Sequence, residues 1–426
     1  MLYKKKSIDG IFNNYVEIEK INIKKKNFSR IQTILGKGNS ISQLPFIKNV
    51  KTLVLESENQ FRIDEKKKLL EVNGNATIGE IHNFLLKRKY FCHYFPSYPL
   101  VSVGACIANG VHGFIPKKGI FTDFVEEIKL CNPNFGIKKL SNKKNQKIFN
   151  LTKCGLGLTG IILSAKIKIF RLKSTEITIK NYNFKNILNC YKFMKKSKTI
   201  YNQNSFTINY SRKNIFLGRL IVGSFKRKIV KYKHIENNKI PKTRLGIFKF
   251  KIIKNFFFNF IFLLEKIKIS ISNKQHINDI MFTSNKRTSY FLFMPKKFIE
   301  YQNLIPDSKV KKYLPKFEHL LKMHKPNISL MHLKLFDQNG KNLEFKKKGL
   351  AIALHILIDK NFDGFYEKLI QLDFQHNCLI NLYKNSLIDE KLLEKFYPNT
   401  LKNFKKKIQS INTKYKFSNS IFEKRI

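Results

Sequence analysis

The stretch Pro96–Gly113, with the sequence PSYPLVSVGACIANGVHG, carries the most information about what this chain does. Its glycine and alanine residues follow one another at close intervals, and the stretch ends at His112 and Gly113. Small side chains allow a backbone to approach a flat ring or a pyrophosphate closely. We therefore expect a ligand of that kind here. Taken by itself, His112 fits a buried structural histidine better than an active-site residue.

Two other glycine-rich segments lie on either side of this stretch. Leu35–Ser42 (LGKGNSIS) places Gly36 and Gly38 around one lysine, and closely spaced glycines let backbone N–H groups turn inward toward a phosphate. Lys153–Ile162 (KCGLGLTGII) precedes a β-like run that ends at Phe170. Each segment alone fits an ordinary turn or hairpin, so only the order and spacing of the three are informative.

In that order, the three segments resemble the FAD-binding (PCMH-type) domain of the vanillyl-alcohol oxidase superfamily. The resemblance is nearest to the decaprenylphosphoryl-β-D-ribose 2′-oxidase group, with sugar-lactone and alditol oxidases more distant. It is strong over residues 30–171 and thinner beyond them. The later matching elements are Leu217–Gly223, Ser289–Pro295, Leu333–Phe336, Asn381–Ser386 and Phe396–Pro398.

The fold that this resemblance implies is α+β with two domains, which suits a length of 426 residues. Residues 1–171 would form the FAD-binding domain, and residues 377–426 would return to it. Residues 172–376 would form a substrate domain built on an antiparallel sheet.

Local patterns predict the individual elements. Strands are expected at Thr52–Glu56, Leu69–Val72, Phe124–Leu130, Gly160–Phe170, Leu217–Phe225, Ser289–Met294, Ser329–Phe336 and Gly349–Ile358. Helices are expected at Gly79–Arg88, capped by Asn75 or Thr77, and at Glu390–Phe396 and Leu401–Ile411. The basic stretch Lys231–Lys251 is expected to be a long loop or insertion.

The resemblance implies FAD as the cofactor, with its pyrophosphate on the glycine loop formed by Gly36, Lys37, Gly38, Asn39 and Ser40. Relatives that attach FAD covalently carry a histidine just before that serine. This chain has Asn39 there, so we predict non-covalent FAD. The other cofactor contacts implied are Ser97, Ser102, Val103, Gly104, Ala105, Asn109, His112, Gly113, Ile161 and Asn381.

The implied reaction is hydride transfer from a secondary alcohol to the flavin, which carries the redox chemistry while the protein orients and polarises. Lys384 matches the essential active-site lysine of the family, and a fixed cation favours the anionic reduced flavin. Lys334 matches a second lysine that contacts substrate. His112 would help to relay the proton.

Three functions remain open from the sequence. The first, implied by the nearest relatives, is oxidation of a polyprenylphosphoryl pentose at the ribose 2′-hydroxyl in cell-envelope polysaccharide synthesis, with a short-chain reductase as partner. The second is oxidation of a soluble polyol or sugar lactone. The third is a non-catalytic basic binding protein on a flavin fold. Ala351 and Ala353 replace polar side chains of the nearest relatives on the substrate face, which leaves the substrate open.

The formal net charge of +53 has two interpretations. Compositional drift toward lysine explains why the lysines are spread along the whole chain, whereas a functional charge would attract nucleic acid or an anionic membrane. No nucleic-acid-binding motif accompanies the charge, so we expect no specific nucleic-acid partner. The six cysteines show no metal-ligand spacing, so we expect no metal site, and scattered thiols favour a reducing compartment.

The chain begins without the apolar core of a signal peptide, so we expect a cytoplasmic location. The Phe-rich run Asn255–Leu264 is too short to span a bilayer. Together with the basic residues before it, residues 249–264 fit either a peripheral contact at the inner membrane face or a core helix of the substrate domain.

Overall fold

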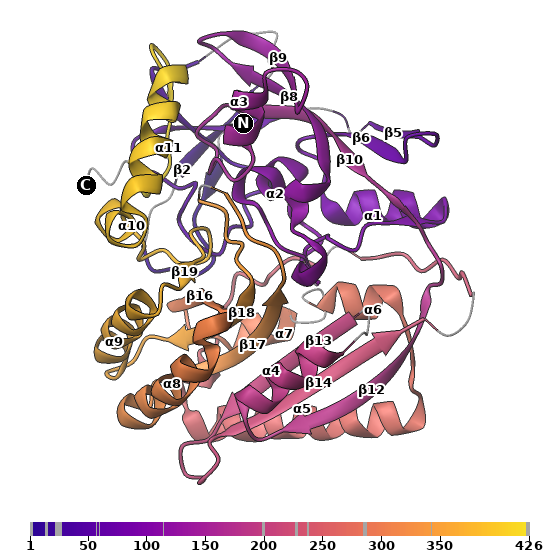
Figure 1. Ribbon diagram of the computed structural model, residues 1–426, viewed down its shortest axis with the longest axis vertical. Helices are drawn as coiled ribbons and strands as arrows, with labels where there is room; N and C mark the ends of the chain where they lie inside the picture. The colour runs from indigo at the N-terminus through magenta and orange to yellow at the C-terminus, as the bar shows by residue number, and fades with distance from the viewer. Residues whose placement is uncertain are drawn as a thin grey trace.

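The computed structural model describes residues 3–12, 16–21, 28–56, 58, 60–113, 115–197, 201–225, 229–236, 238–283, 288–341 and 343–422. Two five-stranded sheets, one eight-stranded sheet and a small two-stranded sheet are surrounded by helices (Figure 1). The α+β fold class is thereby confirmed. The division into domains at residues 171 and 376 stays a prediction.

The first sheet is mixed and contains strands from both ends of the chain, in the order β1-β2-β4-β3-β20. Neighbouring strands from β2 to β20 run parallel, and β1 is antiparallel to β2. The strands are β1 (Tyr3–Lys5), β2 (Val16–Ile21), β3 (Ile31–Ile34), β4 (Lys51–Leu55) and β20 (Lys416–Phe417). The glycine loop directly follows β3, and the carboxyl ends of parallel strands are where α/β sheets usually bind ligands.

The second sheet is antiparallel, in the order β5-β6-β10-β8-β9. Its strands are β5 (Phe61–Asp64), β6 (Leu69–Asn73), β8 (Val125–Asn132), β9 (Gly136–Ser141) and β10 (Ile161–Lys168), and β7 (Tyr90–Phe91) pairs with β11 (Phe170–Arg171) beside it. The accompanying helices are α1 (Ile78–Lys87), α2 (Val103–Asn109) and α3 (Gln146–Thr152). Thr77 caps α1 through a reciprocal pair of hydrogen bonds with Glu80.

Glycine allows α2 to approach the ends of two strands of this sheet. The Gly104 N–H donates to Gly74 O at 2.7 Å. A Cβ on Gly104 would lie 3.1 Å from that same Gly74 O, tighter than an ordinary contact, and 3.8 Å from Cβ of Ile162. The small residues of the Pro96–Gly113 stretch therefore let α2 start close against β6 and β10.

The third sheet is antiparallel, in the order β15-β12-β14-β13-β17-β18-β16-β19. Its strands are β12 (Glu176–Phe184), β13 (Tyr201–Ile208), β14 (Phe216–Ser224), β15 (Lys274–His276), β16 (Phe298–Pro306), β17 (Ile328–Phe336), β18 (Gly349–Leu357) and β19 (Leu379–Ile380). After β19 the chain forms α10 (Glu390–Phe396) and α11 (Pro398–Ile411) and then reaches β20 in the first sheet.

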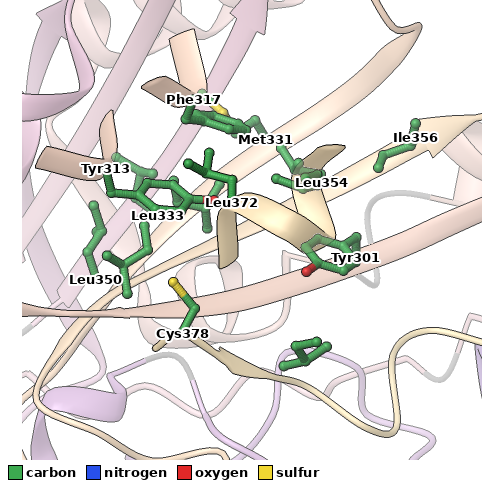
Figure 2. Packing of buried hydrophobic residues seen from close by; sticks show 14 of the residues in the cluster. Tyr301, Tyr313, Phe317, Met331, Leu333, Leu350, Leu354, Ile356, Leu372 and Cys378 are labelled. Atoms are coloured by element: carbon green, nitrogen blue, oxygen red, sulfur yellow. The ribbon is translucent and has the colours of Figure 1, made fainter. Parts of the chain in front are cut away.

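Helices α4 (Ile187–Lys196), α8 (Val310–His324) and α9 (Phe362–Gln375) cover one face of the large sheet (Figure 1). Figure 2 shows the core beneath them, where Met331 of β17 lies beside Phe317 of α8, and Leu354 of β18 and Tyr301 of β16 belong to the same cluster. Because side chains alternate along a strand, the next residues on β16 and β17 point to the opposite face. That opposite face carries the polar residues described below.

Helices α5 (Lys251–Ile271), α6 (Ile277–Met281) and α7 (Thr288–Phe293) follow β14 in sequence. The expected strand at Ser289–Met294 is wrong, because this stretch forms α7. Tyr290, Phe291 and Met294 are buried at helical spacing, and Met294 N donates to Tyr290 O at 3.2 Å. Their aromatic content favours a strand in isolation, but packing against Phe248 and Phe298 selects a helix.

The other expected elements are confirmed to within a few residues at each end. Within Lys231–Lys251, the described residues up to Gly246 form neither helix nor strand, and a short 3₁₀ turn at Ile247–Lys249 leads into α5. The expected loop is therefore confirmed, and the Phe-rich run belongs to the helix that follows it.

Candidate functional site

A cavity of about 350 Å³ lies where the three larger sheets approach one another. One wall is the glycine loop Gly36–Ser40, and a second wall is formed by α2 with the residues just before it. The third wall is the polar face of the large sheet together with Tyr383 and Lys384. A single cavity thus joins the three glycine-rich segments, the third through Leu156, Gly157 and Gly160–Ile162, with the segment that carries Lys384.

Hydrogen bonds fix the glycine loop against the segment before α2. The Asn39 side-chain amide donates to Leu100 O at 3.1 Å. The Ser40 hydroxyl donates to Ser42 O at 2.8 Å, so that proton stabilises the loop and is not directed at a phosphate. At this position Asn39 acts as a structural tie between two walls of the cavity.

The residues present fit FAD at this wall. A Cβ on Gly36 would lie 2.4 Å from the Ser102 hydroxyl oxygen, so the loop and α2 approach as closely as glycine permits. The side-chain oxygen of Asn109 is buried and has no hydrogen-bond partner among the described residues. Buried polar atoms are normally paired, and a cofactor amide, hydroxyl or phosphate ester in the cavity would satisfy such an atom.

Lys5 adds a cation to the glycine loop that the sequence did not reveal. Its ammonium group donates to Lys37 O at 2.7 Å. Burial, together with repulsion from Lys239, Lys37 and Lys242, lowers the Lys5 pKa. An anion bound at the loop would relieve this repulsion, as expected at a pyrophosphate site.

Polar residues on the large sheet form the opposite wall. On this face β16 presents Glu300 and Gln302, β17 presents His332 and Lys334, and the intervening strand β18 presents Ala353 and His355. The strand register places Glu300 opposite His355, and Ala353 between Gln302 and His332. The small Ala353 leaves open space between polar side chains.

Lys384 is paired with Glu300 in this wall. Their charged atoms lie 2.8 Å apart, and the second Glu300 oxygen lies 3.8 Å from Nε2 of His355. Burial acts to raise the Glu300 pKa, but attraction to Lys384, His355 and Lys334 outweighs it and lowers the pKa below its ordinary value. Glu300 is therefore a carboxylate at neutral pH, and Tyr290 holds His355 by a 2.8 Å contact with its Nδ1.

The segment that carries Lys384 is tied to the glycine loop. The Ser42 hydroxyl donates to Tyr383 O at 2.9 Å, and Gln43 N donates to the Ser386 hydroxyl at 2.8 Å. The Ser386 hydroxyl in turn donates to the buried carboxylate of Asp9. These contacts set Lys384 in place from both sides.

His112 holds Gln302 and Lys334. Its Nε2 lies 3.0 Å from the Gln302 side-chain oxygen, which also accepts from the Asn381 amide at 2.8 Å. Nε2 therefore carries a proton, and Nδ1 lies 3.3 Å from the Lys334 ammonium, which can donate to it, and 3.2 Å from Gly113 O. Burial and the Lys334 charge lower the His112 pKa well below its usual range, consistent with a neutral ring. This arrangement favours a positioning role for His112 over proton relay.

Most of the expected site residues line the cavity: Gly36, Lys37, Gly38, Asn39, Ser40, Ser97, Ser102, Gly104, Ala105, Asn109, His112, Ile161, Lys334 and Lys384. Three others do not line it. The Val103 side chain is in the core of the second sheet, Asn381 holds Gln302 from behind, and Gly113 offers its carbonyl to Lys334 at 3.3 Å. The structure gives these three residues roles in packing and positioning, and their cofactor contacts stay predictions.

The sequence analysis missed Glu300, Gln302, His332 and His355. A signal was present, because polar residues at alternate positions in otherwise apolar strands indicate one polar face. Among the described residues no cluster of three or more acidic, histidine or cysteine residues could hold a metal ion. None of the described helices is both long and apolar enough to cross a membrane.

Comparison with known proteins finds sugar oxidoreductases, the chemical class that the sequence resemblance implies. The chain is 28 % identical over 112 residues to D-arabinono-1,4-lactone oxidase of Candida glabrata, which is 26 % of this chain and 21 % of that protein. It is 28 % identical over 139 residues to the enzyme of the same name from Eremothecium gossypii, covering 32 % of this chain and 25 % of that protein. It is also 28 % identical over 106 residues to L-galactono-1,4-lactone dehydrogenase 2, mitochondrial, of Oryza sativa subsp. japonica, covering 25 % and 18 %.

The matches thus span about a quarter or less of these relatives' own lengths. No protein-family model matches the chain. These three relatives are sugar-lactone oxidases and dehydrogenases, a class to which the sequence resemblance is more distant than to the decaprenylphosphoryl-ribose oxidases. The chain is therefore similar over part of its length to oxidoreductases that act on sugar lactones.

Proposed function

We propose that this protein is an FAD-dependent oxidoreductase that oxidises a hydroxyl-bearing carbon of a sugar lactone or polyol, with the cofactor bound non-covalently. The observation that carries the proposal is the shared cavity: the glycine loop and Lys384 with Glu300 line the same space. When bound, FAD supplies the hydride acceptor. The residues of the chain bind, orient and stabilise charge.

The charges of the polar wall suit this reaction. Lys384 and Glu300 form a pair, while Lys334 is held by a neutral imidazole and a carbonyl oxygen. The three charges together are positive, and a positive wall favours the negative charge that a flavin gains on reduction. Lys384 and Lys334 are the residues proposed to provide this stabilisation.

Glu300 is the proposed acceptor for the substrate hydroxyl. One of its oxygens binds Lys384, and the other has no hydrogen-bond partner among the residues that the structure describes. A substrate alcohol could donate its O–H to that oxygen and so be oriented in the cavity. Because Glu300 is ionised at neutral pH, it accepts this hydrogen bond without first losing a proton.

The reaction is tested by anaerobic bleaching of the bound flavin. The full chain would be loaded with FAD and mixed, without oxygen, with aldono-1,4-lactones, with alditols and with a polyprenylphosphoryl pentose. Bleaching by lactones or alditols supports the proposal. Absence of bleaching by every compound, in a protein that has taken up FAD, would contradict it and favour a non-catalytic binding protein.

A lipid-linked pentose is the second candidate, because one observation favours it. Tyr290 lines the cavity, and its ring centroid lies 6.3 Å from that of Phe258 on α5, a helix with an exposed apolar face. A substrate with a long apolar tail could use such a face. Bleaching by the polyprenylphosphoryl pentose alone would select this candidate over the first.

A further inference from the structure

Helix α5 presents an apolar face to solvent. Ile252 is 85 % exposed, Phe256 72 % and Leu263 54 %. The other exposed large apolar residues of the helix are Ile253, Phe260, Leu264 and Ile267. At 3.6 residues per turn, all seven fall within an arc of about 120°. A continuous apolar stripe of this size on a surface marks an interaction site.

The opposite side of α5 packs against the rest of the protein. The helix therefore cannot rotate to bury its exposed apolar face in the core. Phe258 is buried, with its ring centroid 5.5 Å from that of Phe248. The Lys254 ammonium is buried and donates to the Asn327 side-chain oxygen at 2.6 Å and to Ile328 O at 2.7 Å. Burial and the nearby Lys251 lower the Lys254 pKa to about 7. These contacts fix which side of the helix faces outward.

The segment around α5 is strongly basic. Residues 226–275 contain fourteen lysine and arginine residues and two glutamates. Lys242 and Lys249, just before the helix, are exposed. An apolar face with a basic border complements an anionic lipid surface, where apolar side chains enter the acyl boundary and lysines meet phosphates. Nucleic acid would leave the apolar face uncovered.

We propose that α5 docks this protein onto an anionic phospholipid membrane, lying in the plane of the interface with the Ile252–Ile267 face inserted. The helix packs on the side of the large sheet that carries the cavity, because Phe258 clusters with Phe298 and Leu330 of that face. Docking therefore brings the cavity side of the sheet close to the bilayer. The proposal does not depend on the reaction assigned above.

Vesicle flotation of the full chain tests the docking. Wild type is expected to float with phosphatidylcholine vesicles that contain phosphatidylglycerol and to bind vesicles of phosphatidylcholine alone more weakly. The triple variant I252S/F256S/L263S should lose at least about tenfold in affinity, because these side chains supply buried apolar area. The matched control I137S/F374S, which changes two exposed apolar residues on β9 and α9, should bind like wild type. Thermal melting of each variant checks that it is folded.

A single-tryptophan reporter gives a second test that needs no loss of binding. The chain contains no tryptophan, so Phe256→Trp and Ile137→Trp each introduce one. Figure 1 shows α5 and β9 at opposite ends of the molecule. On adding phosphatidylglycerol vesicles, the emission of F256W should shift to the blue and be quenched by brominated acyl chains, while that of I137W should not change.

Three results would overturn the proposal. One is equal vesicle binding by wild type and the triple variant, which would assign binding to charge alone. Another is no vesicle binding by wild type. The third is a wild-type dimer that the triple variant converts to a monomer, with no shift of F256W on vesicles, which would assign the face to a second copy of the chain.

Discussion

Glu300 is the residue that changes how the active-site lysine is understood. The family resemblance assigns Lys384 as a cation beside the flavin, but the structure pairs it with a buried carboxylate at 2.8 Å. The pair keeps Lys384 in one position while Lys334 contributes further positive charge to the wall. Removing either partner would leave the other charge in a buried setting without its partner.

Replacing Lys384 by methionine should therefore slow flavin reduction while leaving FAD bound. Loss of one preorganised charge-stabilising group typically costs about 10²–10³-fold in rate. Anaerobic stopped-flow absorbance would measure the reduction rate with a substrate that bleaches wild type. Lys20→Met, which breaks an exposed ion pair with Glu56, is the matched control, and its flavin should be reduced at the wild-type rate. An unchanged rate in Lys384→Met would remove this lysine from the chemistry.

The glycine loop and α2 depend on one close contact for their geometry. Gly36→Ala would place a methyl group 2.4 Å from the Ser102 hydroxyl oxygen. We expect the two walls to be pushed apart and FAD affinity to fall by about tenfold or more, measured by titrating the flavin-free chain with FAD. Gly136→Ala is the control, because its φ of +75° strains alanine but no atom lies within 4 Å of the added Cβ. Equal FAD affinity in both variants would show that Gly36 does not shape the binding wall.

The elements and the site were predictable from sequence to different extents. The helix at Ile78–Lys87, its Thr77 cap and the strands around it follow from local capping and periodicity, so the expectation and the structure differ by about a residue. Ser289–Met294 was misassigned because its aromatic residues favour a strand, while the contacts that make it a helix come from distant segments. Glu300 and His355 were missed for the same reason, since strand pairing brings them together only in the folded sheet.

At the scale of the whole molecule, the buried carboxyl groups of Asp373 and Asp9 make stability depend on pH. Burial raises the pKa of Asp373 to about 6, despite hydrogen bonds from Tyr301, Tyr313 and Asn303. Burial likewise raises the pKa of Asp9 to about 6. In the unfolded chain both would ionise near 4, so the folded state binds more protons between about pH 4 and 6.

The contribution of these two groups to the free energy of unfolding should therefore be greatest below about pH 4. It should fall as the pH rises from about 4 through about 6. For each group the change is at most roughly 3 kcal/mol. Urea denaturation followed by circular dichroism across this pH range would measure the slope. The slope gives the number of protons released on unfolding. Near pH 5, Asp373→Asn should lower that number by up to about one, whereas replacing the exposed Asp64 by asparagine should leave it unchanged. A slope that is the same in all three proteins would show that Asp373 titrates normally.

The cavity between the glycine loop and the large sheet is proposed to hold FAD without a covalent bond. Acid precipitation of the purified full chain tests it most directly. We predict a yellow protein that releases its flavin into the supernatant as FAD, with about one FAD per chain. A protein that takes up no FAD would contradict the claim, and flavin that stays with the precipitate would contradict the non-covalent attachment inferred from Asn39.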